Sequence, residues 1–236
     1  MKRTFKIAIV FITLTACMAV AVSRISNSRT FQFFGEIVPR VETEEKVVAL
    51  TFDDGPAPGF TDEILQILRD ENIKATFFLI GGAIEENPAE AKKIVEAGHE
   101  LGNHSYSHSR MVFVTPSYVR GEVERTDELI KQAGYGKPTH FRPPYGKKFF
   151  ILSYYLSSAG KATITWDTEP ESYPSIANNS DAIRAHVVET ARPGSIILLH
   201  VMYDRNRTSM NAVKPIVAGL KEKGFRFVTV SELLGR

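Results

Sequence analysis

Hydrophobic and polar positions along the chain alternate between two kinds of segment. Short, continuously apolar runs are typical of strands in a parallel sheet that is buried on both faces. Between them, apolar residues recur at helical spacing, as in residues 64–68. The pattern predicts strands at 46–52, 74–80, 99–103, 139–142, 161–166, 195–200 and 225–230. It predicts helices that begin at Thr61, cover 88–97, 117–133, 149–158, 180–190 (capped by Ser180) and 209–223, and end with a short helix capped by Ser231.

Strands that alternate with helices predict an α/β fold with a parallel sheet, either open and doubly wound or closed into a barrel. Polar residues follow most of the predicted strands. Only a barrel brings the carboxyl ends of many strands to one rim. We therefore expect an irregular, seven-stranded, TIM-barrel-like (β/α) barrel with its active site at those ends. The polar residues are Asp53, Asp54, His104, Arg142, Asp167 and His200.

The N-terminus is predicted to be a targeting segment. Residues 1–22 have a basic head and then a 16-residue apolar run, shorter than the roughly 20 residues of a usual membrane span. Three outcomes stay open: cleavage after Ala19-Val20-Ala21, lipid modification of Cys17 in a lipobox-like sequence, or retention as a membrane anchor. Each places the protein outside the cytoplasm, in the periplasm, in the cell envelope or secreted.

Two further regions follow the targeting segment. Residues 23–45 are predicted to be a linker or edge segment, whose phenylalanines cap the bottom of the fold. Residues 46–236 are predicted to be one catalytic domain, because the chain of 236 residues with 43% apolar content suffices for one sizeable core. We expect this domain to be a monomer. The phenylalanines are Phe31, Phe33 and Phe34.

Charge and cysteine content exclude several classes of function. The formal net charge is +2, but without the three basic residues of the targeting segment 26 basic residues face 27 acidic ones. No basic cluster remains, which argues against nucleic-acid binding. Cys17 is the only cysteine, so the chain contains neither an internal disulfide nor a thiolate zinc site.

Two adjacent carboxylates at the end of a buried strand are costly unless a cation lies beside them. We interpret Asp54 as a metal ligand and Asp53 as a general base. His104 and His108 have i, i+4 spacing, so on a helical turn both rings face one ion. Two imidazoles and one carboxylate form a three-ligand catalytic site, for which zinc is the first choice, cobalt or nickel fit as well, and iron remains open.

Four motifs in order resemble those of the family 4 carbohydrate esterases, the polysaccharide deacetylases with a NodB-homology domain. The resemblance covers about residues 45 to 234 and implies a distorted seven-stranded (β/α) barrel. It also implies a metal-dependent hydrolase that removes N-acetyl groups from an amino-sugar polymer. The motifs are Thr51-Phe52-Asp53-Asp54-Gly55, His104-Ser105-Tyr106-Ser107-His108, Arg142-Pro143-Pro144-Tyr145 and Leu198-Leu199-His200.

The resemblance implies a role for each motif residue. The metal ligands are Asp54, His104 and His108. Asp53 is the general base that takes a proton from water, and Arg142 orients it.

Two further roles concern the leaving amine and the oxyanion. The resemblance implies that His200 is the general acid that protonates the leaving amine. The backbone N–H of Tyr145 stabilises the oxyanion. Residues 201–209, which follow the acid, are predicted to be a solvated loop on the rim of the site.

One motif departs from the family pattern, which has Asp-x-x-Asp-Trp after the fifth strand. Here the sequence is Asp167-Thr168-Glu169-Pro170-Glu171, so the second Asp and the Trp are missing. Asp167 is our candidate for a catalytic carboxylate, with Glu169 and Glu171 as alternatives for supporting the acid histidine. Trp166 or Tyr173 replaces the missing wall of the acetyl pocket.

Three functional hypotheses follow. The first is an exported N-deacetylase acting on peptidoglycan, chitin oligosaccharides or poly-N-acetylglucosamine. The second is an envelope glycan-binding protein with impaired catalysis, which the altered motif suggests and the retained base and acid oppose. The third is a metal-dependent amidase or esterase acting on small substrates.

Overall fold

The strand β2 (Val47–Asp53) lies in the middle of a parallel sheet and is buried along its whole length. A computed structural model describes residues 2–235. In it, β2 pairs with β3 (Thr76–Leu79), β6 (Ile196–His200) and β7 (Arg226–Val228), and β3 pairs with β4 (Glu100–Asn103). All these pairings are parallel, which confirms the predicted α/β class.

The register of the sheet aligns the strand ends that carry polar residues. Asp53 lies opposite Phe78 on one side and His200 on the other. Alternate residues of β2 enter different apolar clusters, with Leu50 and Phe52 on one face and Ala49 on the other. Burial on both faces explains the continuously apolar strand sequences, because no face of the strand meets water.

The remaining strands are very short. β1 (Ile37–Val38), which the sequence did not predict, pairs with β5 (Thr163–Ile164). The strand predicted at 139–142 is reduced to a bridge at Phe141, which pairs with Asn103 and Thr163. Prolines at 138 and 143 flank it, and they supply no N–H for a longer ladder. Another bridge joins Thr168 to Ile197. A closed barrel of seven strands stays a prediction.

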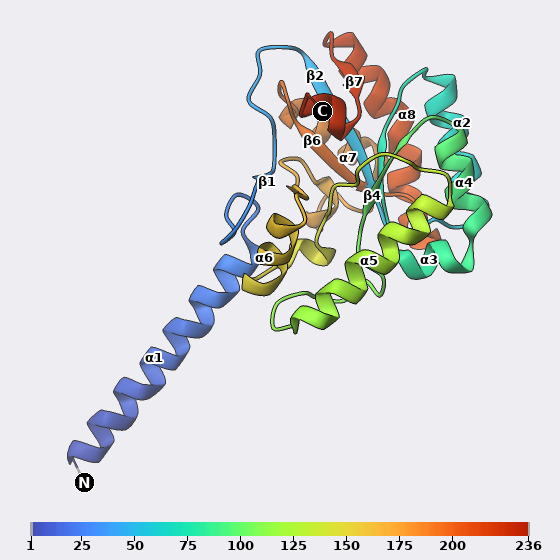
Figure 1. Ribbon diagram of the computed structural model, residues 1–236. Helices are drawn as coiled ribbons and strands as arrows, with labels where there is room; N and C mark the ends of the chain where they lie inside the picture. Colours follow the sequence, from blue (N-terminus) through green and yellow to red (C-terminus); the bar gives the residue numbers. More distant parts are fainter. Residues whose placement is uncertain (1, 236) are drawn as a thin grey trace.

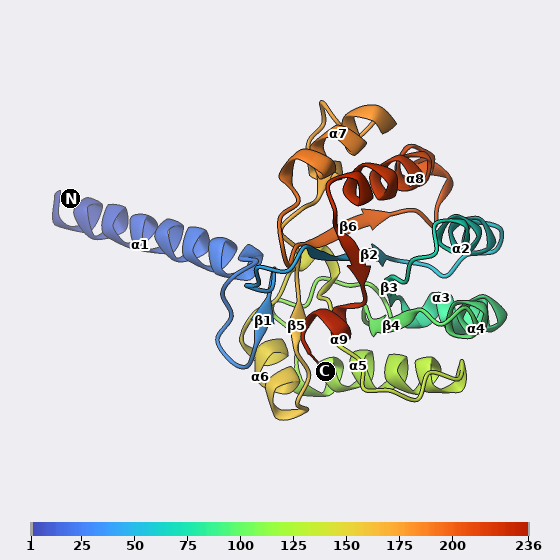
Figure 2. The same ribbon diagram turned by 90° about the horizontal axis from the view of Figure 1, so that it is seen from above.

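The helices surround the sheet (Figures 1 and 2). Helices that contact one another follow the order α7, α8, α2, α4, α3, α5 and α6 around it. Their bounds are α2 Phe60–Asp70, α3 Gly81–Glu86, α4 Pro88–Glu96, α5 Pro116–Gln132, α6 Phe150–Ser158, α7 Ser180–Thr190, α8 Arg207–Glu222 and α9 Val230–Leu233. Short 3-10 turns cover Pro144–Gly146, Pro170–Ser172 and Asp204–Asn206.

Three local predictions were wrong. α3 was missed because it begins with two glycines, which disfavour helix. The cap of α7 is Asn179, whose side chain accepts from the N–H of Ala182, and not Ser180. The cap of α9 is Thr229, which forms a capping box with Glu232 one turn later, and not Ser231.

Helix α1 (Lys2–Asn27) projects away from the domain (Figure 1). Residues Val10–Asn27 are long and apolar enough to cross a membrane, and only 6% of that window is buried within the protein. A signal sequence near an N-terminus has the same properties. The helix therefore fits a cleaved signal, a lipid-modified signal and a retained anchor alike. After α1 the chain runs along the domain and enters β1, where the N–H of Thr165 donates to the Val38 carbonyl over 2.9 Å.

Candidate active site

A cavity of about 720 Å³ opens at the carboxyl ends of the strands. Asp53 reaches it from the end of β2, Asp54 from the next position along the chain, His104 and His108 from the loop after β4, and His200 from β6. The common origin of these side chains at strand ends follows from the parallel sheet, which turns all carboxyl ends to one side.

Asp54, His104 and His108 lie together, with three ligand atoms within 4.8 Å of one another, close enough to share one metal ion. His108 Nε2 is 3.2 Å and His104 Nε2 is 3.8 Å from Asp54 Oδ1. That oxygen is buried without a hydrogen-bond partner among the described residues. A buried carboxylate oxygen is costly when unsatisfied. The donor set therefore fits a divalent cation.

The surroundings of both imidazoles suit metal binding. His104 Nδ1 is 2.7 Å from the Arg142 carbonyl oxygen, which only accepts, so Nδ1 carries a proton and Nε2, on the side of Asp54, is the nitrogen available as a ligand. Burial lowers the pKa of His108, and the nearby His104 lowers it further. A neutral ring is the form that binds a metal ion.

The loop that carries the two histidines is not the helical turn that we predicted. Ser105 and His108 have positive φ angles of 63° and 55°, which lie outside the right-handed helical range. Side-chain oxygens hold this shape. Asn103 Oδ1 accepts from the Ser105 N–H at 2.9 Å, and Glu122 Oε2 on α5 accepts from the N–H groups of residues 106 and 107.

Asp54 also has a left-handed backbone, with a φ of 73°. The next residue, Gly55, has a φ of 65°, and a Cβ there would lie 2.5 Å from Met202 Sδ. Only glycine fits this close approach. Unfavourable backbone conformations gather at functional sites, where the surrounding structure enforces them. Here they turn the carboxylate of Asp54 toward the two histidines.

Asp53 is held by a fully buried arginine. Arg142 Nη1 donates to Asp53 Oδ1 over 2.6 Å and to Thr51 Oγ1 over 2.8 Å. Burial alone would raise the pKa of Asp53, but the Arg142 guanidinium, together with His104 and His200, holds it below its ordinary value. The carboxylate is therefore ionised at neutral pH, as a base must be.

His200 is supported by Glu171, one of the three carboxylates that the sequence left open. Glu171 Oε2 contacts His200 Nδ1, and Glu171 Oε1 accepts from the backbone N–H of His200 at 3.0 Å and from Ser209 Oγ. Burial would lower the pKa of His200, but the hydrogen bond and charge of Glu171, with Asp53 and Asp54, raise it to about 9. The imidazole is thus protonated at neutral pH.

The structure does not bring Asp167 to the cavity. Its carboxylate accepts from Ser195 Oγ at 2.9 Å and from the Ile196 N–H at 3.0 Å, so it fastens the start of β6. Of the two candidate walls, Trp166 lines the cavity and donates from Nε1 to Glu169 Oε2 over 2.8 Å. Tyr173 instead packs against a histidine of α7.

Tyr145 lies at the edge of the cavity with a φ of 57° and 56% of its surface exposed. Its ring packs against that of His108, with centroids 4.7 Å apart. Asn27 and Arg29 were not expected beside this site, since residues 23–45 lack any family motif. Both line the cavity, and Arg29 Nη2 forms a 2.6 Å ion pair with Glu169.

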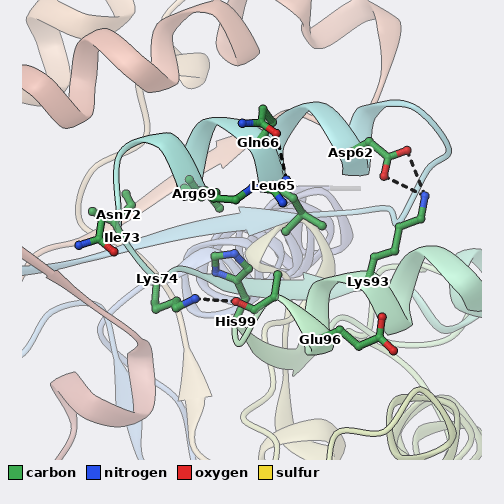
Figure 3. Close-up of a pocket in the computed structure, with 12 residues that line it drawn as sticks. Asp62, Leu65, Gln66, Arg69, Asn72, Ile73, Lys74, Lys93, Glu96 and His99 are labelled. Atoms are coloured by element: carbon green, nitrogen blue, oxygen red, sulfur yellow. Dashed lines mark hydrogen bonds and ion pairs between the residues drawn. The ribbon is translucent and has the colours of Figure 1, made fainter.

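A separate cleft of about 560 Å³ lies between α2 and α4 (Figure 3). Its charged groups are engaged within the protein, since Lys93 Nζ pairs with Asp62 at 2.8 Å and Lys74 Nζ donates to the Ala97 carbonyl. His99 Nδ1 accepts from a backbone N–H at 3.2 Å, and burial lowers its pKa to about 4. This histidine is a structural acceptor, and the cleft lacks the converging groups of the active-site cavity.

Comparison with known proteins agrees with this geometry. A sequence model of the family described as Polysaccharide deacetylase matches residues 40–165. A peptidoglycan-N-acetylglucosamine deacetylase of Bacillus cereus is 33% identical over 200 residues, which cover 85% of this chain and 93% of that protein. PgdA of Listeria monocytogenes is also 33% identical, but the matched region is only 41% of that longer protein.

Solved structures that resemble this chain come from the same family. That of the Bc1960 peptidoglycan N-acetylglucosamine deacetylase superposes with a TM-score of 0.75 and 34% identity, over 80% of this chain and 88% of that one. A CE4 family pseudoenzyme from Bacillus anthracis gives the same TM-score with 28% identity, over 87% of this chain and 69% of that one. Overall similarity therefore does not separate active from inactive members, and the catalytic groups must do so.

Proposed function

The chain belongs to the polysaccharide deacetylase family, and from that premise we propose that it hydrolyses N-acetyl groups of peptidoglycan. The named relatives support an amino sugar of the cell wall as substrate. Chitin oligosaccharides and poly-N-acetylglucosamine carry the same acetamide group and are the alternatives. The observation that carries the proposal is the meeting, in one cavity, of a three-ligand metal site, a base held by arginine and a protonated histidine.

Members of this family use a divalent metal, and Asp54, His104 and His108 are the residues that would hold it here. We propose zinc, because two imidazoles and one carboxylate that leave open positions are typical of catalytic zinc. Cobalt and nickel suit the same donors. When bound, such an ion supplies positive charge that acidifies water and polarises an amide carbonyl.

Asp53 acts as the general base in this proposal. It accepts a proton from water while the water oxygen forms a bond to the acetamide carbon. Arg142 keeps the carboxylate ionised and fixes its direction through the 2.6 Å bond. The backbone N–H of Tyr145, at the edge of the cavity, donates to the oxygen that becomes negative.

His200 acts as the general acid and completes the reaction. It donates a proton to the amide nitrogen as the carbon–nitrogen bond breaks, which leaves a free amine on the sugar and releases acetate. A protonated leaving group is needed because an amide anion departs very slowly. Glu171 supports this role, since its carboxylate keeps His200 charged at neutral pH.

The competing proposal is a glycan-binding protein without turnover. The similarity to a pseudoenzyme and the altered fifth-strand motif speak for it. Against it, Glu171 contacts the acid histidine in place of the missing aspartate, and Asp53 keeps its arginine. A protein that only binds needs neither group. The same experiment, run with small acetylated substrates, tests the third possibility, a small-molecule amidase or esterase.

The test is acetate release from peptidoglycan strands, chitin oligosaccharides, poly-N-acetylglucosamine and small acetamides. We expect release from at least one polymer, loss with a chelator, and recovery with zinc, cobalt or nickel. Asp53→Asn should lower kcat by about 100-fold or more while glycan binding persists. If the unsubstituted protein and Asp53→Asn bind a glycan with equal affinity and neither releases acetate, the result would support a glycan-binding protein without turnover instead.

We also propose that the chain remains attached to the membrane through α1 and acts as a monomer outside the cytoplasm. The basic residues at its start favour a cytoplasmic N-terminus. The apolar run ends at Val22, and Ser26 is already buried against the domain, so little chain is free between helix and fold. The intact mass of the protein extracted from membranes distinguishes retention from cleavage after Ala21 and from lipid modification of Cys17.

A further inference from the structure

A cluster of seven aromatic side chains covers the domain beside the end of α1. Neighbouring rings contact one another with centroids 4.9 to 5.6 Å apart. They come from the segment after α1, the loop before α5, and α6 with the residue that precedes it. We call them the aromatic surface: Phe31, Phe33, Phe34, Phe113, Phe149, Phe150 and Tyr154.

Much of this cluster faces solvent. Phe113 is 80% exposed, Tyr154 57%, Phe31 48%, Phe150 46% and Phe33 39%. The expectation that the phenylalanines of the 23–45 segment cap the bottom of the fold is therefore wrong for two of the three. A contiguous exposed apolar patch on a protein usually marks an interaction site.

The position of the aromatic surface identifies its partner. α1 ends at Asn27, and the surface begins four residues later at Phe31. The junction is fixed, because the backbone N–H of Lys148 donates to the Ser26 carbonyl over 3.1 Å and its Nζ donates to the Ser28 carbonyl. Figure 1 shows α6 near the end of α1, in line with the bonds of Lys148, which lies two residues before α6. A membrane helix that enters the domain without a flexible spacer brings this surface to the bilayer.

The chemistry of the surface suits lipid headgroups. Aromatic side chains are enriched at the membrane–water interface, where the apolar ring meets the acyl boundary. Arg24 lies in the last turn of α1 and is exposed, and Arg120 lines an apolar groove together with Phe34 and Phe150. Cations at this depth attract anionic lipids.

We propose that the aromatic surface rests in the headgroup region of the membrane that α1 spans, and so seats the catalytic domain on the bilayer. This inference rests on the retention of α1 proposed above. Asn27 and Arg29 line the active-site cavity, so the cavity opens beside the point where the chain leaves the membrane. The seated enzyme reaches glycan close to the bilayer.

The test uses the full chain in vesicles of phosphatidylglycerol and phosphatidylethanolamine. Tryptophan replaces Phe33 or Phe150 as a fluorescent reporter, and the signal of Trp166 is subtracted with the unsubstituted chain. We expect emission at shorter wavelength and quenching by at least half when the acyl chains carry bromine near the headgroups. The matched control is Gln66→Trp, an exposed position on α2 at the other end of the domain, which should not be quenched.

Several outcomes would overturn the proposal. One is quenching of the Phe33→Trp and Phe150→Trp reporters that is no stronger than that of Gln66→Trp. Another is a shift of the reporter emission caused by soluble glycan, since the aromatic surface would then bind sugar. A third is a shift that requires two copies of the protein in the same lipid nanodisc, since the surface would then bind a second chain. An intact mass that shows cleavage of residues 1–21 in cells would refute the retention of α1, on which the proposal rests. Acetate release does not enter any of these readouts.

Discussion

Asp53 and Asp54 are adjacent in the chain, yet their surroundings give them different chemistry. One oxygen of Asp53 receives Arg142 at 2.6 Å, so its charge is already compensated by the protein. Asp54 Oδ1 is buried and lacks a hydrogen-bond partner within residues 2–235, so its compensation must come from a cation. The left-handed backbone of Asp54 produces this difference by turning the two carboxylates apart.

This division predicts opposite effects for two similar substitutions. Asp54→Asn should lower zinc affinity by about 100-fold or more, because the site loses its charged ligand. Asp53→Asn should keep metal affinity within a few-fold and lose kcat. Metal content after dialysis, read beside acetate release, separates the two. Equal loss of metal in both variants would contradict the assigned roles.

In the proposed mechanism, Glu171 sets the alkaline limit of activity. His200 must be protonated to act as the proposed acid, and Glu171 raises its pKa to about 9. In Glu171→Gln, burial would dominate and the pKa would fall. We expect the alkaline limb of kcat/KM to move to lower pH, with activity at pH 8 reduced about tenfold or more.

The control for this pH profile is Asp167→Asn, since Asp167 contacts the start of β6 and not His200. Its alkaline limb should stay in place.

The same two variants, Glu171→Gln and Asp167→Asn, also test how the stability of the protein depends on pH. A raised folded-state pKa stabilises the protein fully below the unfolded value near 6.5, and that contribution disappears as pH rises through about 9. Glu171→Gln should remove the dependence, and an unchanged profile would refute the role of Glu171.

At the scale of elements, motif residues were easier to predict than the backbone that presents them. The strands were found because burial on both faces leaves a continuous apolar run. The histidine loop was predicted wrongly as a helical turn because i, i+4 spacing has more than one geometric solution. Asn103 and Glu122 decide the shape, and Glu122 lies on the next helix, α5, 15 and 16 residues beyond the N–H groups from which it accepts. Sequence spacing carries no record of such a contact.

Glu122 should therefore control metal binding from a distance. Glu122→Ala removes the acceptor for two N–H groups between the histidine ligands, at 3.1 and 2.9 Å. We expect metal affinity to fall about tenfold, as for other groups that orient ligands. Competition with a coloured chelator measures it. Glu128→Ala, an exposed position on the same helix, is the matched control. Equal affinities in both variants would mean that the loop holds its shape without Glu122.

For the whole molecule, the predicted domain boundary at residue 46 left out a segment that packs against the domain, because the first family motif begins only at Thr51. The structure places residues 26–40 against the domain, and Asn27 and Arg29 within this range line the active-site cavity. Arg29 lies over the Trp166 ring at 4.7 Å and pairs with Glu169, and the Thr165 hydroxyl donates to the Arg29 carbonyl over 2.7 Å. These contacts are made mainly by backbone and by single side chains, which leave no periodic pattern in the sequence.

A truncation at the predicted boundary should consequently cost stability. Lys148 is only 2% exposed, and burial lowers its pKa to about 8. Its ammonium group donates to the Ser28 carbonyl, which a chain of residues 46–236 lacks. Where the ammonium stays buried in the shorter chain, its uncompensated charge costs about 3–5 kcal/mol. We expect residues 46–236 to melt at least about 6 °C below residues 23–236, at roughly 2–4 °C per kcal/mol.

The substitution Lys148→Met separates this charge effect from the general loss of contacts. In residues 46–236 it removes the stranded ammonium and should recover part of the lost Tm. In residues 23–236 the same substitution removes a satisfied contact with Ser28 and should not raise Tm, because the charge there already has its acceptor. Melting of the two truncated chains within about 2 °C of each other would show that the segment before residue 46 only lies against the domain. A Tm gain from Lys148→Met in both chains would show that the Ser28 carbonyl does not compensate the buried charge.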